Sequence, residues 1–159
     1  MKILVLSDSH GSVDTMLAAV EREKPQAIIH LGDMWADGRA LHRALPEIPF
    51  YQVEGNCDRY SWEPCRDTTI IQMFDGVTCY MTHGHLHGVK TGLLRLALAA
   101  QEAGAGVALF GHTHSSLCTE QNGVLLVNPG SCKFQSGSYA VLNLVQGTAC
   151  CELKKLNVQ

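Results

Sequence analysis

The sequence lacks the cysteine patterns of a disulfide-stabilised or zinc-finger protein. Its seven cysteines are an odd number, and no two of them are spaced as a C-x-x-C pair. Both features argue against a disulfide framework and against a structural zinc site built from thiolates. We therefore expect most of the cysteines to be reduced thiols, several of which fill space in the core.

Basic charge and long apolar runs are also scarce. Twelve lysines and arginines stand against 15 aspartates and glutamates, so the broad basic surface of a nucleic-acid-coating protein is not expected. No segment approaches the ~20 apolar residues of a membrane helix. The N-terminal residues MKILVLSDSH place an aspartate and a histidine where a signal peptide would need small residues. We predict a cytoplasmic protein that does not contact a membrane.

The length of the chain predicts one domain. A chain of 159 residues can bury roughly 70% of the surface that it exposes when unfolded. Its composition is 46% hydrophobic, which is enough for a sizeable core. Because no repeat, linker or low-complexity segment divides the sequence, we predict a single domain over 1–159.

The first part of the chain has the pattern of alternating strands and helices. Aliphatic runs at 2–7, 27–31 and 50–53 are typical of strands in a parallel sheet, which are buried on both faces. Apolar side chains with helical spacing at 13–20, followed by Pro25, predict a helix between the first two runs. A second helix is predicted over 37–45.

The later part of the chain is dominated by hairpin signals. Asp75-Gly76 joins the β-rich runs 68–74 and 77–82, and Asn122-Gly123 joins 117–120 and 124–127. A further pair, 139–145 and 150–156, flanks Gln146-Gly147. Between the hairpins, a helix is predicted over 93–102 and a buried strand over 107–110. This succession predicts an α/β fold in which two sheets pack face to face with helices outside.

Seven polar side chains follow the predicted strands. Each lies immediately beyond the C-terminal end of a strand, the edge at which open α/β sheets bind ligands. Two carboxylates, one amide and four imidazoles suit divalent transition metals such as Mn, Fe, Co, Ni or Zn. Because four ligands satisfy a structural zinc and three a catalytic zinc, seven predict two metals that share a bridging carboxylate. The seven residues are Asp8, His10, Asp33, Asn56, His83, His112 and His114.

The order and spacing of these residues resemble the calcineurin-like metallophosphoesterases. The resemblance rests on D-S-H at 8–10, G-D at 32–33, G-N at 55–56, His83 and GHTH at 111–114. The short length, with GNCD at 55–58, THGH at 82–85 and NPGS at 128–131, is similar to the small YfcE-type phosphodiesterase branch. The resemblance covers nearly the whole chain.

This resemblance implies a fold, a metal centre and an activity. The fold is a four-layer αββα sandwich of two mixed β-sheets flanked by helices. The cofactors are two divalent ions, with Mn expected first and Ni, Fe, Co or Zn as alternatives. The activity is hydrolysis of a small-molecule phosphodiester by in-line attack of a metal-bridging hydroxide. One ion would be held by Asp8, His10 and His114, the other by Asn56, His83 and His112, and Asp33 would bridge them.

The catalytic group expected from the resemblance is Asp33, Asn56, Cys57 and Asp58. Cys57 stands where many members have a histidine that assists the transition state or the leaving group. A thiol is a weaker donor than an imidazolium, so diesters with good leaving groups are expected, unless Cys57 only fills space. Asp58 is expected to orient a neighbouring ligand or thiol, with a solvated loop aspartate as the alternative.

Four residues are expected to contact the substrate: Asn56, His85, Asn128 and Ser131. His85 is alternatively a residue behind the ligands, and Asn128 and Ser131 alternatively belong to a simple connecting turn. His87 is expected to be exposed, and His30 to be a hydrogen-bonded core residue. The loop from Arg59 to Arg66, which contains Trp62, is expected to set specificity.

Two other functions stay open at this stage. A phosphomonoesterase would share the metals but would need more help for its leaving group. A protein-binding scaffold would resemble the retromer subunit that is similar to this family, because a fold alone does not guarantee catalysis. The complete set of ligands favours chemistry. The natural diester and the oligomeric state, including a homo-oligomer, do not follow from the sequence.

Overall fold

Two five-stranded mixed sheets form the centre of the molecule. The computed structural model describes residues 1–58, 66–133 and 137–156. The first sheet contains β1 (Lys2–Leu6), β2 (Ala27–His30), β3 (Phe50–Gln52), β9 (Ser138–Val145) and β10 (Thr148–Lys155), in the order β10-β9-β1-β2-β3. The second contains β4 (Thr69–Phe74), β5 (Val77–Thr82), β6 (Val107–Leu109), β7 (Leu117–Gln121) and β8 (Val124–Asn128), in the order β4-β5-β6-β8-β7.

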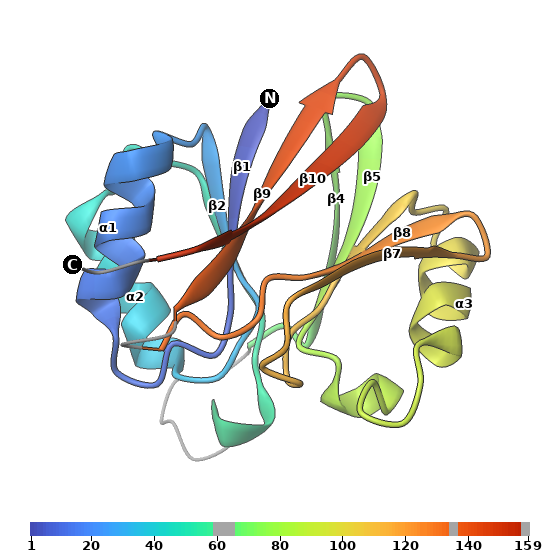
Figure 1. Ribbon diagram of the computed structural model, residues 1–159, viewed down its shortest axis with the longest axis horizontal. Coiled ribbons are helices and arrows are strands. Elements are labelled where there is room, and N and C mark those ends of the chain that lie inside the picture. The colour runs from blue at the N-terminus through green and yellow to red at the C-terminus, as the bar shows by residue number, and fades with distance from the viewer. Residues whose placement is uncertain (59–65, 134–136, 157–159) are drawn as a thin grey trace.

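Helices cover the outer face of each sheet. Helices α1 (Val13–Glu23) and α2 (Trp35–Ala44) lie on one side of the strands, and α3 (Leu94–Glu102) lies on the other (Figure 1). Two short 3-10 turns, η1 (Asn56–Asp58) and η2 (His85–His87), complete the helical elements of the described residues. The predicted four-layer αββα sandwich is therefore confirmed.

Three layers of apolar side chains hold these four layers together. The central one lies between the sheets and includes Val5 and Ile29 of the first sheet and Met81 and Leu109 of the second. The other two lie under α1 and α2 and under α3, respectively. Strands buried on both faces need apolar residues at consecutive positions, which explains the aliphatic runs in the sequence.

The parallel strands determine where the site forms. In the first sheet β1, β2 and β3 run parallel, and in the second β5, β6 and β8 do. Their C-terminal ends therefore lie at one edge of each sheet, and the packing of the sheets brings the two edges together. The polar residues that follow these strands converge for this reason.

Several local features differ from the sequence predictions. Helix α2 begins at Trp35 rather than at residue 37, and neither 3-10 turn was predicted. A three-residue turn is too short to produce a hydrophobic period, so pattern analysis does not find it. Among the helices of the described residues, none is long and apolar enough to cross a membrane.

Candidate metal centre

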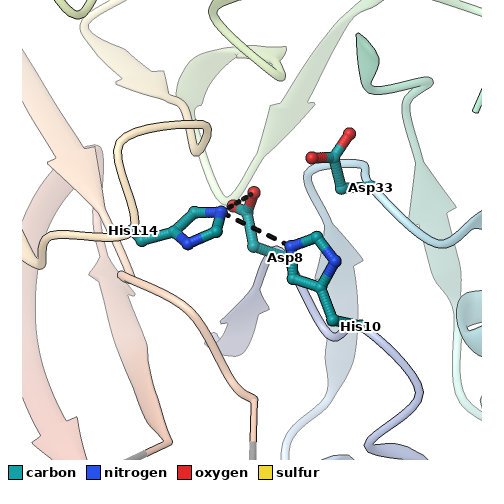
Figure 2. Close-up of side chains that lie close together, drawn as sticks. All are labelled: Asp8, His10, Asp33 and His114. Carbon is teal, nitrogen blue, oxygen red and sulfur yellow. Dashed lines mark hydrogen bonds and ion pairs between the residues drawn. The ribbon is translucent and has the colours of Figure 1, made fainter. Parts of the chain in front are cut away.

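Four predicted ligands form one compact group. The ligand atoms of Asp8, His10, Asp33 and His114 all lie within 4.8 Å of one another, and their side chains face a common centre (Figure 2). His114 Nε2 lies 3.0 Å from Asp8 Oδ1 and 3.4 Å from His10 Nε2. Asp8 is fully buried, whereas the side chain of His114 is 49% exposed. The group therefore opens to solvent on the side of His114.

The other three predicted ligands lie beside this group. His83 Nε2 is 3.0 Å from Asn56 Oδ1, and the rings of His83 and His112 are 5.1 Å apart. The same nitrogen lies 3.5 Å from Asp33 Oδ1. Asp33 is thus within reach of both groups, as a bridging carboxylate must be. The structure brings all seven predicted ligands together.

The donor atoms fit cations better than they fit one another. His83 Nδ1 lies 2.7 Å from the carbonyl oxygen of Leu31, which can only accept, so Nδ1 carries the hydrogen. In the neutral ring, Nε2 then presents a lone pair to the oxygens of Asn56 and Asp33. Ligating histidines commonly donate their other nitrogen to a carbonyl in this way.

The carboxylate of Asp8 also indicates that this group of side chains is suited to a metal ion. Its Oδ2 accepts hydrogen bonds from the Ser7 hydroxyl at 2.5 Å and from the His112 backbone N–H at 3.1 Å. Its Oδ1 is buried and accepts no hydrogen bond from any part of the chain that the structure describes. Buried polar atoms are almost always paired, so a carboxylate oxygen of this kind that faces imidazole nitrogens is suited to a divalent cation.

The backbone is strained at the ligands. Positive φ angles occur at Asp8 (53°), His10 (45°), Asp33 (60°), His112 (69°) and His114 (60°). A residue with a side chain costs of order 1–3 kcal/mol in this conformation, which persists where surrounding contacts enforce it and is concentrated at functional sites. Five of the seven predicted ligands therefore share a backbone conformation that is unfavourable for residues with a side chain.

Two motif glycines allow close approach to the carboxylates. A Cβ on Gly55 would overlap the Asp33 backbone nitrogen and carboxylate, and a Cβ on Gly111 would overlap the Ser7 hydroxyl and approach the Asp8 carboxylate. The glycines of G-N and GHTH are thus required by packing against the ligands.

Asp58 positions the loop that carries Asp33. Its carboxylate is 4% exposed and accepts the backbone N–H groups of Asp33, Trp35 and Gly55 at 2.8–3.0 Å. It therefore ties the segment after β2 to the segment after β3. This agrees with the expectation that Asp58 orients a ligand and differs from the alternative of a solvated aspartate.

Charge and burial tune the groups around Asp33. Burial alone would raise the pKa of Asp33, but His83 and the Cys57 backbone N–H, which lies 2.9 Å from Asp33 Oδ1, outweigh it and lower the pKa. Burial and the neighbouring Asp33 raise the pKa of the Cys57 thiol. Burial and the charges of His83 and Lys90 lower the pKa of His112. At neutral pH this favours an ionised Asp33, a protonated Cys57 and a neutral His112.

Two expected substrate contacts have a different place in the structure. Asn128 is fully buried; its amide nitrogen donates to Gly111 O and Thr113 Oγ1 at 2.9 and 3.0 Å, and its oxygen accepts from Gly130. Ser131 Oγ donates to the Asp8 carbonyl at 2.7 Å. The expectation that Asn128 contacts phosphate is corrected, because its side chain is buried and holds the loop of the predicted ligands. Ser131 is half-buried, and its contact with phosphate stays a prediction.

Three histidines outside the predicted ligand set, His85, His87 and His30, lie in different surroundings. His85 lies beside the second ligand group, with its ring 5.4 Å from that of His83 and 6.1 Å from that of His112. His87 is half-buried against the Tyr80 hydroxyl at 3.1 Å, so the expectation that it is exposed was wrong. His30 is a fully buried, hydrogen-bonded core residue, as expected.

Sequence reasoning did not find Ser9 and Asp37. The Ser9 hydroxyl donates to Asp37 Oδ2 at 2.8 Å beneath the first ligand segment. No spacing in the sequence signals this contact between a loop and the first turn of α2. Trp62 and the other residues at 59–65, expected to set specificity, lie outside the described residues.

Comparisons with known proteins agree with this geometry. A family model described as the calcineurin-like phosphoesterase superfamily domain matches residues 1–147. The chain is 35% identical to the probable metallophosphoesterase YsnB of Bacillus subtilis, over 94% of this chain and 88% of that protein. It is 26% identical to the phosphodiesterase YfcE of Escherichia coli, over 90% of this chain and 88% of that protein.

Solved structures show the same fold. A predicted phosphoesterase from Streptococcus pneumoniae superposes with a TM-score of 0.79 at 25% identity, over 97% of this chain and 88% of that chain. Vps29 from Entamoeba histolytica in complex with zinc superposes with a TM-score of 0.72 at 19% identity, over 99% of this chain and 100% of that chain. At that identity the second match concerns the fold alone.

Proposed function

The chain belongs to the calcineurin-like phosphoesterase superfamily, and from that premise we propose that it hydrolyses phosphodiester bonds with two divalent metal ions. The observation that carries the proposal is the convergence of inward-facing donor atoms around Asp33. Asp8, His10 and His114 surround it on one side, and His83 with Asn56 lies on the other. The phosphodiesterase name of relatives such as YfcE supports the diester.

The chain and its metals divide the chemistry. When bound, the two ions would supply hydroxide near neutral pH and offset negative charge on the phosphoryl oxygens. The chain would hold them: Asp8, His10 and His114 one ion, Asn56, His83 and His112 the other, with Asp33 between. The exposed side of the site, at His114 and Cys57, would admit a small phosphodiester from solution, which we place in the cytoplasm.

The thiol of Cys57, which would assist the leaving group, is a weak acid. Burial and Asp33 raise the pKa of the Cys57 thiol, so the thiol keeps its proton at neutral pH but gives it up less readily than an imidazolium. An enzyme with this donor should hydrolyse activated diesters, whose leaving groups need little help. Cys57 thereby favours a diesterase over a monoesterase.

A protein-binding scaffold is the competing function. Vps29 from Entamoeba histolytica has the same sandwich, but this similarity concerns the fold alone. The complete set of seven ligand side chains, the strained backbone at five of them and the buried Asp8 oxygen favour a metal enzyme.

The decisive experiment is metal add-back on the purified protein. Metals are removed with a chelator, Mn²⁺ or Ni²⁺ is returned, and hydrolysis of an activated aryl diester is compared with that of the matching monoester. We expect turnover to return with metal and to favour the diester. Turnover that does not return would favour the scaffold, and a preference for the monoester would favour a phosphomonoesterase.

An Asp33→Asn variant tests the bridge in the same assay. We expect a loss of more than about 100-fold, because even partners outside the ligand shell are commonly worth 10–100-fold. Asp14, an exposed acid in the first turn of α1, provides the matched control, and Asp14→Asn should retain full activity. A near-normal rate for Asp33→Asn would refute the bridging role.

A further inference from the structure

A buried chain of polar side chains lies behind the first ligand segment. Ser9 stands between the ligands Asp8 and His10 and is fully buried. Its hydroxyl donates to Asp37 Oδ2 at 2.8 Å, and the same oxygen accepts the backbone N–H of Gly11 at 2.7 Å. Asp37, on the first turn of α2, is 8% exposed. One carboxylate oxygen therefore binds the two chain neighbours of His10, Ser9 through its hydroxyl and Gly11 through its backbone N–H.

His30 extends this chain to the second ligand segment. Its ring is fully buried, and Nδ1 accepts the backbone N–H of Gly32 at 3.4 Å. Nε2 then carries the hydrogen and donates to the Ser9 hydroxyl at 3.2 Å. Because Gly32 precedes Asp33, one ring connects the segment that carries Asp8 and His10 with the segment that carries Asp33.

The first ligand segment needs such support. Asp8 and His10 both have positive φ, at 53° and 45°, a conformation that residues with a side chain keep only where surrounding contacts enforce it. Ser9, between them, is held from one side by Asp37 and from the other by His30. Relaxation at Ser9 would turn both ligand side chains away from their shared centre.

We propose that Asp37, Ser9 and His30 are positioning residues for the metal ion held by Asp8, His10 and His114. None of the three is a ligand. The inference rests on the proposed function, since it concerns the same metal centre. It predicts an asymmetry for Ser9 and Asp37, which hold the segment of Asp8 and His10: loss of their hydrogen bond weakens the ion held by Asp8, His10 and His114 and spares the ion held by Asn56, His83 and His112.

The test measures Mn²⁺ binding instead of turnover. Wild type, Ser9→Ala and Asp37→Ala are stripped with a chelator, and Mn²⁺ is titrated calorimetrically. We expect two binding steps in wild type, and in both variants one step weakened by about 10–100-fold with the other unchanged. Asp37→Asn keeps an oxygen that can accept both hydrogen bonds and should restore most of the affinity. Asp14→Ala, an exposed acid on the first turn of α1, is the control.

Thermal unfolding in chelator separates positioning from stability. If Ser9→Ala loses stability without metal but keeps both wild-type affinities, the role is structural and the inference is overturned. If Asp37→Ala does not fold, Ser9→Ala, which removes one hydroxyl group, decides alone. A wild-type chain that binds no Mn²⁺ would overturn the proposed function, and this inference with it. Two ions bound equally by wild type and Ser9→Ala would overturn only the inference.

Discussion

Cys57 determines how strongly the site can assist a leaving group. It stands beside Asp33, whose carboxylate accepts the Cys57 backbone N–H. Cys57→His should place a better proton donor there and extend hydrolysis to diesters with poorer leaving groups. For the poorest we expect a gain of about 100-fold, the lower end of what general acid catalysis typically contributes. The measurement is kcat/KM over a series of aryl diesters of rising leaving-group pKa, with Cys57→Ser as the control. An unchanged dependence on the leaving group would show that Cys57 only fills space.

His30 should make the stability of the metal-free protein depend on pH. Burial lowers the pKa of His30 from 6.5 to about 4, so between these values the unfolded chain takes up a proton that the folded chain does not. Stability is then highest above pH 6.5 and falls as pH decreases toward 4. The His30 contribution to this fall is about 3 kcal/mol.

The measurement is denaturant unfolding of wild type and His30→Gln in chelator at pH 7 and pH 4. The glutamine keeps a donor for Ser9 but does not titrate, so the variant should lose less stability between the two pH values. Equal losses in the two proteins would contradict a neutral, buried His30.

The chemistry of single residues was predictable, but their partners were not. Asp8, Asp33 and the histidines predicted to be ligands were singled out because their side-chain types and their places after strands suit a metal, and the structure brings them together. Asn128 ends β8 and Ser131 follows it, yet their side chains donate to Gly111, Thr113 and the Asp8 carbonyl. Whether a loop side chain faces solvent or its own backbone depends on contacts between distant segments, which one sequence does not show.

At the scale of elements, the loops after the strands depend on close backbone packing. A Cβ on Gly55 would overlap the Asp33 backbone and carboxylate, so Gly55→Ala should displace the segment after β3 from the segment after β2. Because Asp33 and Asn56 lie on these segments, we expect Mn²⁺ affinity to fall by at least about 10-fold with strand content unchanged.

Calorimetry and circular dichroism measure the two effects of Gly55→Ala. Gly106→Ala is the matched control, since a Cβ at Gly106 meets no atom within 4 Å and its φ is not in the left-handed region. If both variants bind Mn²⁺ as wild type does, the close approach at Gly55 is unimportant for the site.

Helices and strands were predicted where their sequence patterns are distinct. The aliphatic runs of β1, β2 and β6 and the Asp75-Gly76 and Asn122-Gly123 turns correspond to observed strands and hairpins. The start of α2 and the turn η1 were missed because they depend on loop contacts such as those of Asp58. The turn η2 was missed because three residues are too few to show a hydrophobic period. These missed elements lie beside the ligands, where local pattern is weakest.

At the scale of the whole molecule, the site exists only where two sheets meet. Predicted ligands that follow strands of the first sheet, Asp33 and Asp8, contact His83 and His114, which follow strands of the second. The family resemblance predicted this sandwich, whereas composition and periodicity alone predicted only two packed sheets with helices outside. The extent of a single domain over 1–159 stays a prediction.

The most direct test of the dinuclear centre is anomalous diffraction from a crystal soaked in Mn²⁺. We predict two peaks, one among Asp8, His10 and His114 and one among Asn56, His83 and His112, with the Asp33 carboxylate bound to both. Data that show no Mn²⁺ at these residues, or a single ion that Asp33 does not touch, would contradict a dinuclear centre bridged by Asp33.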